Sequence, residues 1–424
     1  MHLPKGYREF GELGEFRAYQ KFPCHTYENG ELYMPMLHIA QFVYNQLLIF
    51  LVLYPSAVMH ASFLLLAISA AGSWALPSSR ASCRELNIPI PVTVPRFIIN
   101  ATVENDWDVV DLVFNLTRRD LGTSADPLSL LNYVTADEEN TYMIGATLCG
   151  TGETMLVLTH GILESKLYWD PSLPGAGKYS FIDAAVKAGY SVLSYDRIGV
   201  GSSSKVNGLT DAQFQVETAV LNKIVEYARK IPHISKVALI GHSYGSYISS
   251  ASASQVDVDA LVLTGFTGTF TYFGPFLAGS NLRVANTLDA ARWGDLDSAY
   301  ISTADLYSET YIYFASPYFD HSIAKWAFEV STQPFAVGEL PSLLNTTLDY
   351  TSITAPVYIL QGQYDVSACG GNCVGLLDAT AAMFPGSKAV EWVDDLPAGH
   401  SLNLHKVAPK AFKMIFDFLS AQGV

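Results

Sequence analysis

The chain is poor in charged residues, and basic residues are the scarcer kind. Its 424 residues include 25 Lys and Arg against 40 Asp and Glu, a formal net charge of -15. Charged residues make up 15% of the chain, where about 25% is usual for a soluble protein. Because proteins that bind nucleic acid concentrate Lys and Arg against phosphates, this balance argues against a nucleic-acid partner.

Cysteine is also scarce. Of the five cysteines, Cys24 lies upstream of an apolar tract, and Cys83, Cys149, Cys369 and Cys373 lie downstream of it. Two glycines between Cys369 and Cys373 let that loop turn sharply enough for a disulfide, which leaves Cys83 to pair with Cys149. Four free thiols or a metal site are the alternatives. No His or Asp cluster stands at ligand spacing around these cysteines, so we expect no metal ion.

The residues from Met36 to Gly72 are almost uncharged and contain two apolar blocks. These blocks, Leu47–Tyr54 and Ala61–Gly72, are separated by Pro55. The second block is followed by Ser73-Trp74-Ala75, which has the small-x-small form of a signal-peptidase cleavage site. The tract therefore predicts contact with a membrane during or after synthesis.

Three topologies are open for this segment. Either Met59 is the working start of a cleaved signal peptide, or the whole tract is a signal anchor, or the chain crosses the membrane twice. Two passes would return the remainder to the cytosol, where neither paired cysteines nor glycosylation sequons make sense. Such sequons begin at Asn100, Asn115 and Asn345. We expect a secreted protein, with anchoring through this segment alone as the alternative.

Downstream, apolar strand-like runs alternate with amphipathic helical patterns. Continuous Val, Ile and Leu runs of this kind indicate an α/β fold with a mostly parallel sheet covered by helices on both faces. The predicted strands are Met155–Thr159, Ser191–Tyr195, Lys236–Ile240, Ala260–Thr264, Val357–Gln361 and Ala389–Val393. The predicted helices are Phe181–Ala188, Asp211–Arg229, Val374–Phe384 and Ala408–Leu419.

An aromatic-rich segment from about Phe266 to Ile353 interrupts this alternation. It predicts a mostly helical cap. Most of its aromatic side chains are expected to form the cap's own core and its seam with the sheet, and some to line a pocket. Upstream of the core, short β-rich runs at Ile88–Val94 and Tyr142–Leu148 predict an extension that leads into the first strands. The expected parts are residues 1–75 (extension with signal peptide or anchor), 76–145 (extension and first strands), 146–265 (core), 266–353 (cap) and 354–424 (core).

The clearest chemical motif is a strand that runs directly into G-x-S-x-G and then into a helix of small residues. Gly241, Ser243 and Gly245 hold the fixed positions, after the predicted strand that begins at Lys236. Such a turn holds a serine hydroxyl in a strained conformation beside a helix N-terminus, and the glycines let strand and helix approach closely. This context predicts that Ser243 is a nucleophile.

A second predicted strand is followed by His160, Gly161 and Ile162. An oxyanion formed by attack of Ser243 needs two N–H donors, one from the residue after the nucleophile and one from this earlier loop. We predict Tyr244 and Ile162 as these donors. His160 is expected to brace the loop by hydrogen bonds and not to transfer protons, and Gly161 to support the same turn.

A third turn begins with Asp196 and Arg197 and contains G-x-G. It differs from a glycine-rich phosphate loop because it has no Lys and no x-x-G completion. We interpret the two charged residues as structural, holding the loop beneath the site.

Two C-terminal motifs place Asp365 after one predicted strand and His400 after the last. His400 is predicted to accept the proton of Ser243 and return it to the leaving group, while Asp365 holds the imidazole tautomer and stabilises its cation. His405 competes for the role of base, although it stands where the final helix should begin. The alternatives to Asp365 are Asp394, Asp395 and Glu339.

With the motifs HGI, YDRxGxGxS, GHSYGS and GHxxNxH, the chain from about Cys83 to its end resembles the α/β-hydrolase superfamily, and specifically secreted fungal serine hydrolases. The resemblance implies the α/β-hydrolase fold, in which Ser, Asp and His follow in that order. It also implies an esterase, lipase or related acyl hydrolase, in some cases of a secondary-metabolite pathway. The region before Met59 has no counterpart in this pattern.

The expected reaction is hydrolysis of a carboxylic ester, lactone or thioester through an acyl-enzyme on Ser243, with no cofactor. A serine at this turn disfavours haloalkane dehalogenases and epoxide hydrolases, which use aspartate. An acyltransferase or peptidase remains the alternative, and an inactive binding protein is disfavoured because every chemical position is filled. The aromatic cap indicates an apolar or aromatic small-molecule substrate.

Overall fold

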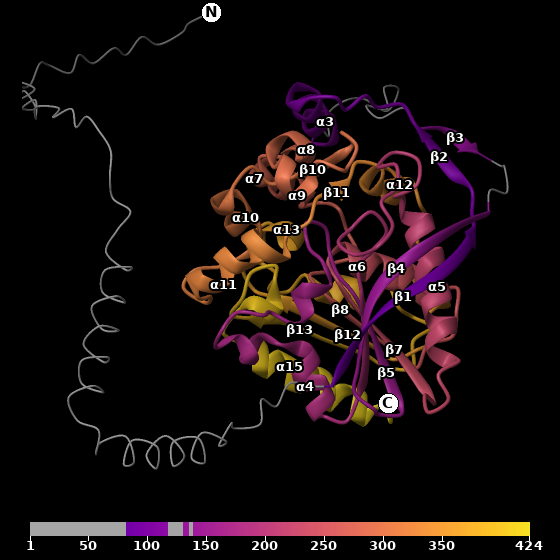
Figure 1. Cartoon of the computed structure of the whole chain (residues 1–424). Helices are drawn as coiled ribbons and strands as arrows, with labels where there is room; N and C mark the ends of the chain where they lie inside the picture. The colour runs from indigo at the N-terminus through magenta and orange to yellow at the C-terminus, as the bar shows by residue number, and fades with distance from the viewer. Residues whose placement is uncertain (1–81, 118–129, 135–138) are drawn as a thin grey trace, which may run out of the picture. The chain divides into compact units, whose positions relative to one another are not determined.

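An eight-stranded sheet organises the described part of the chain. The computed structural model describes residues 82–117, 130–134 and 139–424, so Cys24 and the predicted signal sequence lie outside it. The strand order is β1-β4-β6-β5-β7-β8-β12-β13 (Figure 1). These strands are β1 (Cys83–Thr93), β4 (Glu139–Cys149), β5 (Thr154–Thr159), β6 (Ser191–Tyr195), β7 (Lys236–His242), β8 (Ala260–Thr264), β12 (Val357–Gly362) and β13 (Val390–Leu396).

The direction of the strands determines where a site can form. β4 pairs antiparallel with β1 and β6, whereas the pairs from β6–β5 to β12–β13 are parallel. β5 lies between β6 and β7, so the chain leaves β5 toward one side for β6 and later returns on its other side as β7. Ligands of open α/β sheets bind outside the carboxyl ends of the strands at such a switch point.

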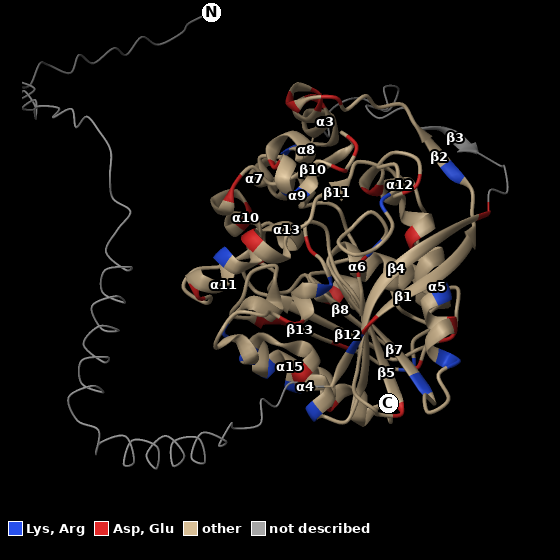
Figure 2. Ribbon diagram, in the orientation of Figure 1, with Lys and Arg blue, Asp and Glu red and all other residues tan. Residues whose placement is uncertain are grey.

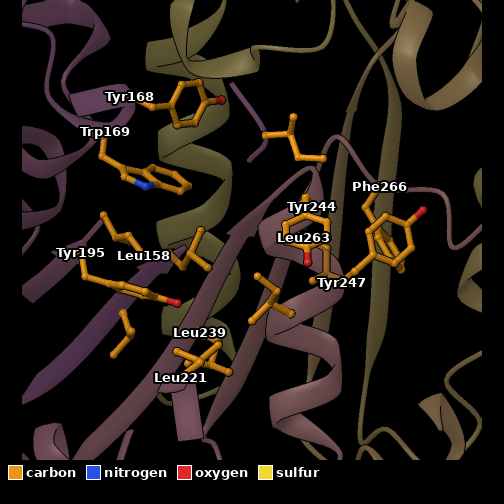
Figure 3. Packing of buried hydrophobic residues seen from close by; sticks show 14 of the residues in the cluster. Leu158, Tyr168, Trp169, Tyr195, Leu221, Leu239, Tyr244, Tyr247, Leu263 and Phe266 are labelled. Carbon is orange, nitrogen blue, oxygen red and sulfur yellow. The ribbon is translucent and has the colours of Figure 1, made fainter. Parts of the chain in front are cut away.

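Helices cover both faces of the sheet, as the sequence predicted. α4 (Phe181–Lys187) and α15 (Ala408–Ala421) pack together on one face, and α5 (Phe214–Arg229) and α6 (Tyr244–Ala253) on the other (Figure 1). The buried side chains of α5 recur with the helical period, and Figure 3 shows one of them, Leu221, in the buried layer that also contains Leu239 of β7.

An insertion separates β8 from β12. It contains the helices α7 (Phe273–Ser280), α8 (Ala285–Leu288), α9 (Ala290–Trp293), α10 (Leu306–Tyr313), α11 (His321–Trp326) and α12 (Glu339–Leu344), and a short sheet of β9 (Arg283–Val284), β10 (Tyr300–Ser302) and β11 (Phe335–Ala336). Its aromatic residues divide by environment: Trp293 and Tyr300 are buried, whereas Tyr307 is 79% exposed.

Two parts of the secondary structure differ from the sequence-based expectation. The region interpreted as β-rich contains, besides β2 (Arg96–Ile99) and β3 (Leu130–Val134), the helix α3 (Asp106–Thr117). Acidic residues in its first turn complement the helix dipole, and it buries Val109 and Leu112 on one side.

The second difference is the expected helix Val374–Phe384, which is reduced to α14 (Leu377–Ala381). Gly375 has a φ of +81°, which is outside the helical region, and Cys373 just before it is tied by a disulfide. The helix therefore begins only after these constraints end.

Both expected disulfides are present. Cys83 of β1 bonds to Cys149 of β4, and the two residues are direct partners in the strand register. Cys369 and Cys373 close the short loop after α13 (Val366–Cys369), and both side chains are buried. The first bond joins the start of β1 to the end of β4, and the second stiffens the segment that follows Asp365.

Charged residues are scattered over this domain. In Figure 2 the Lys and Arg residues are interspersed with Asp and Glu and do not gather on one group of elements. Within residues 82–117, 130–134 and 139–424, no helix combines the length and the hydropathy that a membrane-spanning segment requires.

Candidate active site

Ser243 stands at a strained turn between β7 and α6. Its φ of 54° and ψ of −123° are unusual for a residue with a side chain, and its N–H is held by the carbonyl of Thr264 at 2.8 Å. A Cβ at Gly245 would lie 2.3 Å from the carbonyl oxygen of Thr159, and one at Gly241 would lie 2.5 Å from Ser246 Cα. Both glycines are therefore required for the close approach of strand and helix.

The structure brings Ser243, His400 and Asp365 into one hydrogen-bonded row. His400 Nε2 lies 2.7 Å from Ser243 Oγ, and His400 Nδ1 lies 2.6 Å from Asp365 Oδ2. Because a carboxylate only accepts, Nδ1 carries the hydrogen and Nε2 is free to accept the serine proton. Asp365 is held in turn by the N–H of Ala368 at 2.8 Å and by the side-chain amide of Gln361.

Burial and mutual charge act in opposite directions on this pair. Burial alone would raise the pKa of Asp365, but the charge and hydrogen bond of His400 lower it below its ordinary 3.8. Burial alone would lower the pKa of His400, and the carboxylate of Asp365 raises it above 6.5. The row therefore favours a carboxylate beside an imidazole that readily accepts a proton.

The competing residues are engaged elsewhere. His405 accepts the N–H groups of Gly399 and Ala315 with Nε2, at 2.9 and 3.0 Å, and donates from Nδ1 to Ser401 at 2.8 Å. Burial lowers the pKa of His405 to about 4, so this histidine is a neutral brace. Asp394 accepts the N–H of Gly375. Asp395 is exposed on β13, and Glu339 is paired with Arg197.

The loop after β5 lies directly against the nucleophile. A Cβ at Gly161 would lie 2.8 Å from Ser243 Cβ. Ile162 and Tyr244 line the same cavity as Ser243. Among the described residues, neither the N–H of Ile162 nor that of Tyr244 has a hydrogen-bond acceptor. Both amides are thus available to an oxygen bound at the serine.

His160 joins this loop to a neighbouring turn through two hydrogen bonds. Its Nδ1 hydrogen is donated to the carbonyl of Gly161 at 2.9 Å, and its Nε2 accepts the N–H of Arg197 at 3.1 Å. Complete burial, together with the nearby Arg197 charge, lowers its pKa well below 6.5. The ring stays neutral and joins the turn after β5 to the turn after β6.

Asp196 and Arg197 act separately and not as a pair. Asp196 accepts the N–H of Lys166 at 2.9 Å and the N–H and hydroxyl of Ser202 at 2.9 and 2.7 Å. The guanidinium of Arg197 binds Glu217 at 2.5 Å and Glu339 at 2.9 Å. Asp196 therefore holds the backbone at Lys166 and Ser202, whereas Arg197 holds the side chains of Glu217 and Glu339.

A narrow cavity opens onto Ser243 and His400. The volume of this cavity is about 50 Å³. Apart from His400, none of its lining residues carries an acidic or basic side chain. Aromatic and aliphatic side chains from α6, the insertion and α12 form most of the wall, namely Tyr247, Phe270, Phe273, Phe276, Leu340, Leu343 and Leu344. Figure 3 shows Tyr247 facing Phe266, and their ring centroids are 4.8 Å apart.

Four residues around the row were not predicted from the sequence. Gln361 lies near the end of β12 and Gly265 directly follows β8, both at the carboxyl edge of the sheet, and that position was a usable signal. Tyr313, from the insertion, stacks on His400 with ring centroids 5.5 Å apart and planes within 11°. No sequence pattern connects it to the site. Glu164 follows Gly161 by three residues and accepts its N–H.

No group of three His, Cys, Asp or Glu side chains suited to a metal ion occurs in the part of the chain that the structure describes. The residues around Ser243 instead supply a hydroxyl, an imidazole, a carboxylate and two free amides. A hydroxyl, an imidazole and a carboxylate in hydrogen-bonded sequence, beside two free amides, are the groups that acyl transfer through a serine requires.

Comparison of the sequence with family models places it in a family with this fold. The model of the alpha/beta hydrolase family matches residues 156–412, which is more than half of the chain. The protein therefore belongs to the alpha/beta hydrolase family. No curated protein matches the sequence.

Solved structures with the same fold are distant in sequence. An alpha/beta hydrolase fold protein from Chitinophaga pinensis has 15% identity, a TM-score of 0.47, and coverage of 66% of this chain and 94% of its own. A carboxylesterase from Nitrososphaera gargenis has 18% identity, a TM-score of 0.48, and coverage of 67% and 96%. A monoacylglycerol lipase from Paleococcus ferrophilus has 17% identity, a TM-score of 0.48, and coverage of 66% and 99%.

Proposed function

We propose that this protein is a serine hydrolase that cleaves a carboxylic ester, lactone or thioester through an acyl-enzyme on Ser243. The observation that carries the proposal is the row from Ser243 Oγ through His400 to Asp365, with distances of 2.7 and 2.6 Å. Family membership supports the same class of reaction.

The contacts of these residues support the following course for the proposed reaction. His400 Nε2 takes the proton as Ser243 Oγ bonds to the acyl carbon, and the imidazolium is stabilised by Asp365. The carbonyl electrons move onto oxygen, where the amides of Ile162 and Tyr244 can receive them. When the tetrahedral centre collapses, the leaving group departs with the proton from His400. Water then attacks the acyl-enzyme in the same manner, and Ser243 regains its proton.

The cavity wall supports a neutral, apolar substrate. Binding pockets of this kind gain affinity from apolar area and use few polar anchors, and an ionised substrate would lose hydration here with no opposite charge to replace it. Outside the site itself, the polar side chains of the wall are the hydroxyls of Ser367, Thr269 and Tyr247. Uncharged aryl or medium-chain acyl esters are therefore the proposed substrate class.

The experiment that tests the reaction is labelling with a fluorophosphonate, combined with hydrolysis of a series of nitrophenyl esters. We expect the label on Ser243, and we expect neither label nor turnover for Ser243→Ala. A series that prefers acetate, with no gain for longer or aromatic acyl groups, would contradict the proposed substrate class. Absence of labelling in the wild-type protein would contradict the reaction itself.

We also propose that the protein is secreted through its N-terminal apolar segment. The two disulfides support an oxidising compartment. Two of the sequon residues, Asn100 and Asn345, are exposed. Intact-mass analysis of protein from the culture medium tests this proposal, because cleavage after the small-x-small sequence, added sugar and lost thiol hydrogens each change the mass.

A further inference from the structure

Glu164 is a buried carboxylate that contacts both sides of the candidate site. Its side chain is nearly inaccessible, with 6% exposure. Oε2 accepts the N–H of Gly161 at 2.8 Å, and Oε1 accepts the hydroxyl of Ser401 at 3.4 Å. Oε1 also faces His242 Nε2 at 3.4 Å. Because a buried carboxylate is costly without partners, these contacts require an explanation beyond chance.

The hydrogen bonds of His242 determine which of its nitrogens carries a hydrogen. Thr264 Oγ1 lies 3.1 Å from the carbonyl oxygen of Gly241 and can only donate to it, which uses its one hydrogen. Thr264 Oγ1 must then accept from His242 Nδ1, at 3.0 Å. His242 Nε2 therefore faces Glu164 Oε1 across 3.4 Å, and it has no hydrogen-bond partner among the described residues. The contact between the two side chains is thus electrostatic and not a hydrogen bond.

The contacts of Glu164 with Gly161 and His242 join the two loops that carry the free amides. Gly161 immediately precedes Ile162, and His242 stands two residues before Tyr244, so Glu164 contacts the chain close to each free amide. Between Gly161 and Glu164 the chain reverses through Leu163, a non-glycine residue with a φ of 57°. Such backbone strain persists where surrounding contacts hold it, and it concentrates at functional sites.

The ring of His242 is itself held rigidly. Tyr168 stacks on it with ring centroids 4.5 Å apart and planes within 17°, and the ring of His400 lies 4.9 Å away on centroids. The charge of Glu164 also acts on His400 and, together with the larger effect of Asp365, raises its pKa. The contact is thus placed to align the donors and to favour the protonated base.

We propose that Glu164 is a positioning residue that ties the loop after β5 to the turn after β7 and so sets the spacing of the two oxyanion donors. This inference rests on the proposed function. In the ground state Glu164 touches neither the nucleophile nor the cavity, and its effect is exerted through Gly161 and His242. Its loss should therefore weaken the binding of the tetrahedral state more than the binding of substrate.

The test uses Glu164→Met, which keeps the length of the side chain and accepts no hydrogen bond, and Glu164→Gln as the conservative variant. Glu309→Gln is the matched control, since Glu309 is also a buried carboxyl but is bound to Thr303 and Thr332. For each variant, kcat and KM are measured on a nitrophenyl ester. The affinity for an aryl trifluoromethyl ketone, which forms a tetrahedral adduct with serine, is measured in parallel.

We expect Glu164→Met to lose about 10- to 100-fold in kcat and a similar factor in ketone affinity, somewhat less than deletion of an oxyanion donor, with KM little changed. In Glu164→Gln the amide oxygen accepts from Gly161 and the amide NH₂ donates to His242. A neutral acceptor is weaker than a carboxylate, so a matched loss of roughly two- to tenfold is expected. Glu309→Gln should keep wild-type values.

Several outcomes would overturn the proposal. These are a folded Glu164→Met with unchanged kcat, a loss of kcat with unchanged ketone affinity, or an equal loss in Glu309→Gln. If Glu164→Met does not fold, Glu164→Gln decides: a matched loss supports the proposal, and unchanged kcat or an effect on KM alone contradicts it. A wild-type protein that neither labels nor turns over ester refutes the proposed function instead, so the two failures are distinguishable.

Discussion

The guanidinium of Arg197 lies over the ring of Tyr244, with 4.7 Å between its central carbon and the ring centroid. The same guanidinium binds Glu217 of α5 and Glu339, the first residue of α12, and reaches the carbonyl of Gly161 at 3.4 Å. One buried cation therefore joins the core, the insertion and both candidate oxyanion loops. Because Tyr244 supplies one of the free amides, this cluster supports the site from beneath.

Removing the guanidinium should destabilise the whole domain. Arg197→Met leaves two buried carboxyls without their cation, and we expect a loss of about 3–5 kcal/mol in the free energy of unfolding. Urea denaturation followed by fluorescence measures it. Lys223→Met serves as the control, since its ion pair with Glu226 is on the surface, and it should change stability by less than about 1 kcal/mol. Equal effects of the two substitutions would contradict the role of the cluster.

The same cluster predicts a pH dependence of stability. Burial, only partly offset by Arg197, raises the pKa of Glu217 from 4.5 to about 8, and burial also raises the pKa of Glu339. A carboxyl whose pKa is higher in the folded state contributes stability that is complete below pH 4.5 and is lost as the pH rises through about 8.

We therefore expect the Tm of the wild-type protein to fall between about pH 7 and pH 9, and Glu217→Gln to flatten this slope. Thermal melts at constant ionic strength across that range are the measurement. A slope that is unchanged in Glu217→Gln would assign the effect to other groups.

Activity should increase as the pH rises, the opposite direction to stability, because it requires the neutral form of His400. Since Asp365 raises the pKa of His400 above 6.5 and only the neutral imidazole accepts a proton, kcat/KM should fall as the pH drops through that raised pKa. Asp365→Asn should move the inflection to lower pH and lower kcat by roughly 10³- to 10⁴-fold, because the tautomer is no longer held. A pH–rate profile of both proteins tests this, and an inflection that stays in place would contradict the assignment of the acid.

A methyl group at position 265 should damage the site more than the fold. A Cβ at Gly265 would lie 2.9 Å from Cε1 of both His400 and His242, at a φ of +59°. We expect Gly265→Ala to lower kcat by at least about tenfold, because small displacements of a catalytic base are costly. Gly177→Ala, where a Cβ meets no atom within 4 Å, is the control and should retain activity. Full activity of Gly265→Ala would show that His400 tolerates displacement.

Much of the fold was predictable because its signals are local. The buried strands of the parallel sheet appear as continuous apolar runs, and Ser191–Tyr195 and Ala260–Thr264 have the predicted bounds. Strand, G-x-S-x-G and helix are adjacent in the chain, so the turn at Ser243 follows from a few neighbouring residues. By contrast, α3 was missed because its sequence also contains the Val and Phe that favour strands.

The sequence by itself determined the alternation of strands and helices, the position of the strained serine and the choice of four cysteines that could pair. Only the tertiary structure decided that His405 braces a loop while His400 meets Ser243, and that Glu164, Gln361 and Tyr313 surround them. The reason is physical: a hydrogen bond depends on distances of a few ångströms, here between residues as far apart in the chain as Ser243 and His400, which are separated by 157 positions, and no local pattern encodes that contact.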